Sequence, residues 1–180
     1  MKPTFISLCF LIFPFAIVAQ NINGSFVHKG NTRTYILHIP PTYSGLTPVP
    51  LVLNLHGYSQ TASIQQFYSV FDAVADTANF ILVYPNAVNS VWDTIFINSP
   101  IDDVSFLSEM IDTISKKYNI DSLMIYSTGI SMGGFMTYRL ACELSGKIAA
   151  VASVSGPVVQ SFLDSCNNTG SIPVLHFHGT

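Results

Sequence analysis

Charge is scarce in this sequence. Asp, Glu, Lys and Arg together make up 9% of the 180 residues, and the formal net charge is −3. In an average globular protein about a quarter of the residues are charged. No basic patch and no run of like charges occurs, which argues against binding to nucleic acid. Uncharged polar residues must therefore supply most of the hydrated surface, as suits a protein that meets neutral polymers.

Long apolar runs are missing after the first twenty residues, so no membrane span is predicted there. Residues 1–19 have the features of a secretory signal peptide: Lys2 is positive, residues 8–18 are apolar, and the small Ala19 stands where cleavage is expected. A membrane anchor is the alternative, but Pro14 interrupts the run, which is short for a span. We expect a cleaved signal and a secreted protein without membrane attachment.

Cysteine is also rare, with three in the chain. Cys9 lies inside the expected signal, which leaves Cys142 and Cys166 as a pair in an oxidising compartment. A disulfide between them and two separate buried thiols are both consistent with the sequence. His176 and His178 alternate on one expected strand and resemble a metal-binding pair, but no further ligand is close in the sequence. We expect no metal and no organic cofactor.

The pattern of apolar residues indicates a single α/β domain over residues 20–180. Short strands are expected at 25–29, 34–39, 51–55, 80–84, 123–127, 148–154 and 174–177. One helix is expected between the third and fourth strands, from the spacing of Phe67, Val70, Phe71, Val74 and Ala78. A second helix should begin at Asp103, and a third should follow Ser131. Strands that alternate with helices predict a mostly parallel sheet with helices on both faces.

Gly129-Ile130-Ser131-Met132-Gly133 has the G-x-S-x-G pattern of a nucleophile elbow. A strand is expected before it and a helix after it, which is the context that such a turn requires. Ser131 at the tip needs a strained positive φ, and side chains at the flanking glycines would clash across the turn. The alternative is a glycine-rich connection with an incidental serine. We interpret Ser131 as the nucleophile.

A serine nucleophile needs a base and two donors for the oxyanion. The Met132 N–H, at the start of a helix, is one candidate donor. The Tyr58 N–H is the other, because it follows Leu55-His56-Gly57 at the end of a strand. His56 could be the base, although a His-Gly pair at this place more often shapes the oxyanion loop. Asp102 and Asp103 could be the acid, but helix capping explains them.

These motifs resemble those of the secreted polyhydroxybutyrate depolymerase and feruloyl/acetylxylan esterase family, within the α/β-hydrolase superfamily. The resemblance covers nearly all of the chain after the signal. It rests on matches in the same order along the chain: Arg33-Thr34-Tyr35, Pro50-Leu51-Val52, Leu55-His56-Gly57, Tyr84-Pro85-Asn86, Trp92-Asp93, Asp102-Asp103-Val104, Gly129 to Gly134, Tyr138 to Glu143, and His178-Gly179-Thr180.

The resemblance implies an esterase that forms an acyl-enzyme on Ser131, with the Tyr58 and Met132 amides as oxyanion hole. In this family the triad acid comes soon after the His-Gly-Thr segment and the histidine much later. Both are therefore expected beyond Thr180, so the C-terminal part of the fold should be missing and the fragment nearly inactive. Trp92 is expected either to face the substrate or to lie buried in the core.

The implied substrates are feruloyl or acetyl esters on plant polysaccharides, or short polyhydroxyalkanoate esters. Two other functions stay open: a serine peptidase of the same superfamily, and a non-catalytic module that binds a polymer. We expect the 174–177 strand of the fragment to form an unprotected edge that favours aggregation. The sequence does not indicate the acyl specificity or the oligomeric state.

Overall fold

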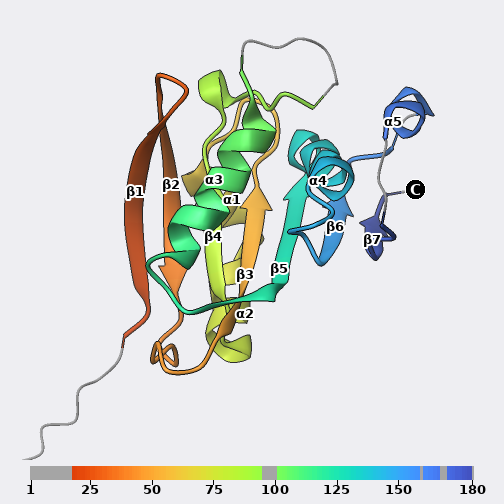
Figure 1. Ribbon diagram of the computed structural model, residues 1–180. Coiled ribbons are helices and arrows are strands. Elements are labelled where there is room, and N and C mark those ends of the chain that lie inside the picture. Colours follow the sequence, from red (N-terminus) through yellow and green to blue (C-terminus); the bar gives the residue numbers. More distant parts are fainter. Residues whose placement is uncertain (1–17, 95–100, 159, 167–169, 180) are drawn as a thin grey trace, which may run out of the picture.

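A seven-stranded sheet forms the centre of the molecule (Figure 1). The computed structural model describes residues 18–94, 101–158, 160–166 and 170–179. The strands are β1 (Gln20–His28), β2 (Asn31–Ile39), β3 (Val49–Leu55), β4 (Ile81–Pro85), β5 (Ile120–Ile130), β6 (Ala150–Val154) and β7 (Val174–Phe177). Their order is β1-β2-β4-β3-β5-β6-β7. β1 and β2 are antiparallel to their neighbours and the other pairs are parallel, which confirms the expected α/β class.

Helices cover both faces of the sheet. The helices are α1 (Ala62–Ser69), α2 (Phe71–Ala78), α3 (Asp103–Ser115), α4 (Met132–Glu143) and α5 (Gln160–Ser165), with a 3₁₀ turn, η1, at Val88–Ser90. In Figure 1, α3 and α4 lie in front of the sheet and α1 and α2 lie behind it. None of the helices in these ranges is long and apolar enough to cross a membrane. Most of the expected signal, residues 1–17, lies outside the described residues.

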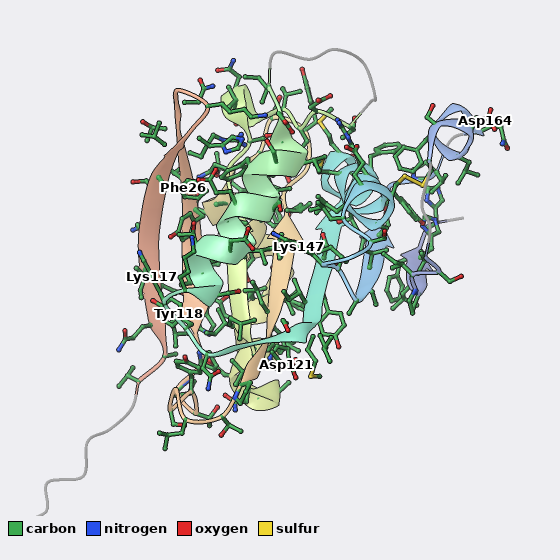
Figure 2. All side chains as sticks on the ribbon, viewed as in Figure 1. Phe26, Lys117, Tyr118, Asp121, Lys147 and Asp164 are labelled. Carbon is green, nitrogen blue, oxygen red and sulfur yellow. A yellow bond between two sulfur atoms is a disulfide. The ribbon has the colours of Figure 1, made fainter. Side chains whose placement is uncertain are left out.

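The alternation of side chains along β3 divides the core in two. Leu51, Leu53 and Leu55 point to the α3 and α4 face, whereas Val52 belongs to the smaller cluster on the α1 and α2 face. Both sets are buried, which explains the continuous apolar run of this strand. At the edge of the larger cluster Phe26 of β1 packs against α3 (Figure 2), with its ring centroid 5.5 Å from that of Phe106.

The expected single helix between β3 and β4 is wrong, because the structure has two. Val70 adopts a left-handed conformation with φ 50°, which ends α1 and begins α2. Of the residues whose spacing predicted one buried face, Phe67, Val70 and Val74 are exposed. The short helix α5 was not predicted at all. β5 also begins earlier than expected, and Leu123 in its first half is 81% exposed rather than buried.

Candidate active site

Ser131 lies at a sharp turn between β5 and α4. β5 ends at Ile130 and α4 begins at Met132. Ser131 has φ 53° and ψ −117°, a conformation that costs a residue other than glycine about 1–3 kcal/mol. Two backbone hydrogen bonds hold it: its N–H donates to the Val154 carbonyl at 2.8 Å, and its carbonyl accepts from the Phe135 N–H at 3.0 Å. The result is the strained, exposed serine turn that the G-x-S-x-G pattern predicts.

Glycines let the elbow pack directly against the end of β3. A Cβ at Gly133 would overlap the Leu55 carbonyl oxygen and would lie 2.7 Å from that of His56. A Cβ at Gly129 would lie 2.6 Å from the carbonyl of Gly133. These neighbours are backbone atoms, which cannot rotate away as a side chain could. A larger residue at either position would therefore displace Ser131.

The elbow lies where the order of the strands reverses. The chain passes from β3 to β4 on one side of β3, and β5 then pairs on the other side, followed by β6 and β7. Leu55 of β3 is opposite Gly129 of β5, so the loops after these two parallel strands emerge side by side. In open α/β sheets ligands bind outside the carboxyl ends of the strands at such a point.

The loop after β3 reaches this turn. A Cβ at Gly57 would be 3.6 Å from the Ile130 carbonyl oxygen, which is ordinary contact distance. No hydrogen bond to another described residue engages the Tyr58 N–H. The Met132 N–H is among the first of α4, and such groups have no partner within their helix. Within the described ranges neither amide forms a backbone hydrogen bond with another residue, which is a condition for the oxyanion hole expected at Tyr58 and Met132.

Gln60 fixes the shape of the same loop, and the sequence reasoning missed it. Its Oε1 accepts from the Gly57 N–H at 3.0 Å, and its own N–H donates to the Gly57 carbonyl at 3.2 Å. The signal for this role is slight: a long amide side chain stands three residues after a glycine, where it can close a tight turn.

His56 supports the loop after β3 from the interior of the protein. It is fully buried. Its Nε2 accepts from the Ala87 N–H at 3.1 Å, so its Nδ1 carries the proton and donates to the Gly57 carbonyl at 2.8 Å. Burial lowers the pKa of His56, and the hydrogen bond to Gly57 and the charge of Asp103 offset this only in part. A neutral His56 with both nitrogens bonded to the backbone shapes the loop, and neither nitrogen is free to serve as a base.

Trp92 is a core residue that braces this loop. Its side chain is almost completely buried. The indole N–H donates to the His56 carbonyl at 2.9 Å, and the two ring centroids are 4.8 Å apart. Of the two interpretations of Trp92, the structure shows the buried one, because the indole finds its hydrogen-bond partner inside the protein.

Asp102 and Asp103, the two candidate acids, are both held by structural partners. Asp102 caps α3 by accepting a backbone N–H of the first turn at 2.9 Å, and it binds Lys29 at 2.6 Å. Asp103 is fully buried, binds the Arg33 guanidinium at 2.6 Å and accepts the Asp93 N–H at 2.8 Å. The prediction that Asp103 caps the helix is therefore wrong, because its carboxylate turns inward to neutralise Arg33.

The other histidines have contacts elsewhere. They pair as His28–Glu109 at 2.5 Å, His38–Asp76 at 2.8 Å and His176–Tyr138 at 2.9 Å, and His178 stacks on His176. Within the described part of the chain no histidine or carboxylate forms a hydrogen bond with Ser131. In the same ranges no three His, Cys, Asp or Glu residues are grouped so that they could hold a metal ion.

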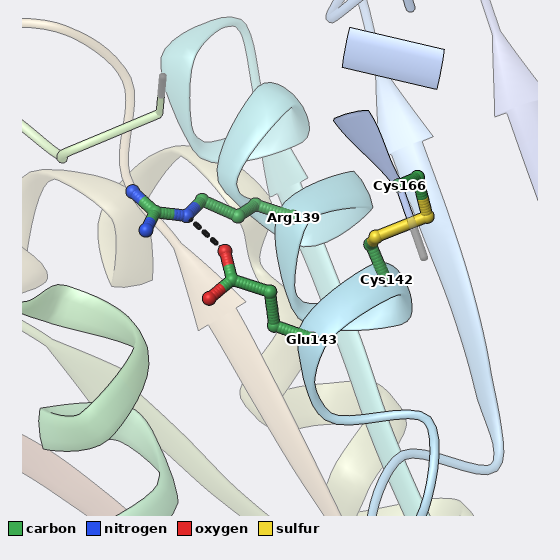
Figure 3. Close-up of a disulfide and its surroundings, with 4 residues drawn as sticks. All are labelled: Arg139, Cys142, Glu143 and Cys166. Atoms are coloured by element: carbon green, nitrogen blue, oxygen red, sulfur yellow. Dashed lines mark hydrogen bonds and ion pairs between the residues drawn. A yellow bond between two sulfur atoms is a disulfide. The ribbon is translucent and has the colours of Figure 1, made fainter. Parts of the chain in front are cut away.

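A disulfide ties α4 to the segment between β6 and β7. Cys142 of α4 is bonded to Cys166, which follows α5 (Figure 3), with their Cα atoms 5.6 Å apart. Arg139, one turn before, pairs with Glu143 at 2.5 Å and with Asp93 at 2.9 Å. The end of α4 is thus fixed both to the chain near α5 and to the loop after Trp92. The cross-link spans 24 residues, a loop length for which about 3 kcal/mol of stabilisation is typical.

No protein-family model matches the chain. It is 37% identical over 164 residues to the bifunctional acetylxylan esterase/xylanase XynS20E of Neocallimastix patriciarum, covering 89% of this chain and 23% of that protein. It is 31% identical over 177 residues to feruloyl esterase D of Neurospora crassa, covering 91% of this chain and 56% of that protein. The chain therefore spans only about a quarter to a half of the length of these curated relatives.

Solved structures include a thermostable esterase that superposes on this chain with a TM-score of 0.69. The match covers 88% of this chain and 55% of the esterase, at 20% sequence identity. At that identity the likeness is one of fold alone.

Proposed function

We propose that this chain, a homologue of feruloyl and acetylxylan esterases with the α/β-hydrolase fold, carries the nucleophile and the oxyanion hole of a serine esterase. The observation that carries the proposal is the strained Ser131 turn at the switch point of the sheet, beside the Tyr58 and Met132 N–H groups, which form no hydrogen bond with another described residue. Strain of this kind persists only where the surrounding structure enforces it, as it does at many active sites.

In the proposed reaction, the Ser131 Oγ attacks the ester carbonyl while a base takes its proton. The Tyr58 and Met132 N–H groups stabilise the oxyanion of the tetrahedral intermediate. The alcohol then leaves with a proton from the base, and water releases the acid from the acyl-enzyme by the same steps in reverse order. No described histidine or carboxylate forms a hydrogen bond with Ser131, so we propose that the triad histidine and its acid come from outside the described residues.

The proposed substrates are feruloyl or acetyl esters linked to a polysaccharide, since the printed names of the relatives are those of feruloyl and acetylxylan esterases. Short hydroxyalkanoate esters are a second class to include in an assay. Residues 1–19 are proposed to direct secretion, and the Cys142–Cys166 disulfide supports this because such bonds persist in oxidising compartments.

The test compares the protein encoded by the complete transcript with its Ser131→Ala variant. We expect hydrolysis of p-nitrophenyl acetate and of feruloylated or acetylated xylan, with a loss of at least about 1,000-fold in kcat in the variant. We expect the 180-residue chain alone to show a similarly low rate, because no described histidine or carboxylate forms a hydrogen bond with Ser131. Cleavage of peptide anilides in preference to esters would assign a peptidase instead. Polymer binding without any hydrolysis would assign a binding module.

A further inference from the structure

Two buried contacts hold His56, and each comes from a different part of the chain. The Ala87 N–H, in the loop after β4, donates to the His56 Nε2 at 3.1 Å. The Trp92 indole N–H, in the segment after η1, donates to the His56 carbonyl at 2.9 Å. Because Tyr58 lies only two residues further along, the position of its N–H depends on how these two segments are held.

Arg33 of β2 and Asp103 of α3 are bonded to both of these segments. The Arg33 Nη2 donates to the Asn86 carbonyl, in the loop after β4, at 3.2 Å, and to the Asp103 Oδ1 at 2.6 Å. The second carboxylate oxygen of Asp103 accepts the Asp93 N–H, in the segment after η1, at 2.8 Å. One ion pair therefore anchors both segments that contact His56.

The ion pair is enclosed by the protein. The side chains of Arg33 and Asp103 are 2% and 0% exposed, and the guanidinium carbon lies 3.6 Å from the ring centroid of Phe106. The Arg33 Nε finds no hydrogen-bond partner among the described residues, which costs free energy. The desolvation of two charges also offsets their attraction, so a buried ion pair is weak evidence of a stabilising role. What the bonds of this pair do provide is a fixed place for two separate segments.

A carboxylate suits the two donors that meet at Asp103. One of its oxygens faces the Arg33 guanidinium and the other faces the Asp93 N–H. An asparagine in the same place would offer one oxygen, and its NH₂ group would face the second donor. It could therefore keep the bond to Arg33 or the bond to Asp93, but not both.

We propose that Arg33 and Asp103 are positioning residues for the oxyanion hole. Their ion pair fixes the two segments that hold His56, and His56 in turn fixes the Tyr58 N–H. The inference rests on the proposed function for the use of that N–H in ester cleavage. Both residues act through His56 and not on the substrate, so their loss should slow the chemical step without weakening the binding of the ester.

A double substitution that removes the ion pair without leaving a buried charge tests this inference. In Arg33→Met/Asp103→Leu, apolar side chains of similar volume replace the pair, an exchange that is often neutral for stability. The matched control is Lys147→Met/Asp112→Leu, which removes a 2.7 Å ion pair between α3 and the segment after α4. Neither control residue lies in the segments after β3, β4 or η1. If the double variant does not fold, Asp103→Asn decides by the same two measurements.

Trp92 reports on the segment after η1, since it is the only tryptophan of the sequence. In the 180-residue chain at micromolar concentration, quenching of its fluorescence by acrylamide measures how often this segment opens. We expect the quenching constant to rise about threefold or more in Arg33→Met/Asp103→Leu and to stay unchanged in the control. Circular dichroism and urea denaturation show whether each variant is folded.

Ester hydrolysis by the transcript-encoded protein provides the second measurement. With p-nitrophenyl acetate we expect kcat to fall about 10- to 100-fold in Arg33→Met/Asp103→Leu, because a displaced oxyanion donor is missed mainly in the transition state. KM should change less than about twofold. Asp103→Asn should show a smaller loss of kcat, because it keeps one of the two bonds of Asp103. The control should keep both constants.

The two measurements separate this inference from the proposed function. Increased quenching together with a lower kcat at unchanged KM supports both. Increased quenching, when the wild-type transcript-encoded protein hydrolyses no ester, supports the control of the loop by the ion pair and removes the proposed function. Unchanged quenching and unchanged kcat in a folded double variant overturn the inference even if Ser131 hydrolyses esters. An equal loss of kcat in the control, or a loss that lies in KM, also overturns it, because the pair would then act through general stability or substrate binding.

Discussion

Ser131 keeps its position through backbone contacts that leave no room for adjustment. The hydrogen bond from its N–H to the Val154 carbonyl joins the turn to β6. Because Gly129 and Gly133 have no Cβ, the turn can pack directly against the end of β3. The site is thus assembled from three neighbouring strand ends. The two glycines and Ser131 itself stand out in the sequence, but Val154 acts through its carbonyl and carries no sequence signal.

Gly133→Ala tests this arrangement. The new methyl group would overlap the Leu55 carbonyl oxygen, so α4 must shift. We expect the free energy of unfolding to fall by about 2–3 kcal/mol, and ester hydrolysis by the transcript-encoded protein to fall about 100-fold as Ser131 moves. Urea denaturation and an ester assay measure the two effects.

Gly146→Ala is the control for that substitution, since nothing lies within 4 Å of a Cβ placed there. It should change the free energy of unfolding by no more than about 0.5 kcal/mol. Equal effects of the two substitutions would show that the contact with β3 does not hold the elbow.

At the level of single residues, the sequence predicted positions where the backbone geometry requires a particular residue type. It did not predict which of several possible partners a side chain binds. The position of Gly129-Ile130-Ser131-Met132-Gly133 between an expected strand and an expected helix favours a strained turn over a glycine-rich connection with an incidental serine, so the turn could be predicted. Asp102 and Asp103 are equivalent as capping residues in the sequence. Their roles diverge because Arg33, distant in the chain, is buried opposite Asp103.

Among the elements, α3 depends on Asp102 at its N-terminus. Burial alone would raise the pKa of Asp102, but the hydrogen bonds from Lys29 and Ser105 outweigh it and lower that pKa from 3.8 to about 2. Because the folded-state pKa lies below the unfolded value, ionised Asp102 stabilises the fold above pH 4. This contribution is lost as the pH falls through about 2.

Substitution of Asp102 tests this dependence of stability on pH. We expect Asp102→Ala to lower the free energy of unfolding at pH 7 by about 1 kcal/mol. Between pH 4 and pH 2 the difference between variant and wild type should shrink, which urea titrations at several pH values would reveal. Asp102→Asn keeps a capping acceptor without the charge, so it should lose less. A difference that stays constant down to pH 2 would contradict the role of the charge.

The sequence predicted some of the helices that pack against the sheet better than others. The apolar residues of α3 and α4 recur at helical spacing and pack in the larger core cluster. The face that the spacing predicts as buried is therefore the face that packs on the sheet. α1 and α2 share one apparent period, but the left-handed Val70 breaks it, and no glycine or proline marks the break. Most apolar residues of α1 therefore face outward, which the pattern could not predict.

At the scale of the whole molecule, β7 is one edge of the described sheet and β1 is the other. It pairs with β6 on one side, and no described strand pairs with its other side. All four of its residues are exposed, with Leu175 at 55% and Phe177 at 53%. A strand of this kind offers unpaired N–H and C=O groups and apolar side chains to another molecule.

We therefore expect the purified 180-residue chain to associate in a concentration-dependent manner through β7. Leu175→Lys places a charge on this edge and should shift the chain toward the monomer, because a lysine must be desolvated before another strand can pair there. Sedimentation velocity over a range of protein concentrations measures the change. Leu46→Lys, at a loop position that is 88% exposed, adds the same charge away from the edge and should leave association unaltered. If the unmodified chain stays monomeric at every concentration, β7 does not mediate self-association.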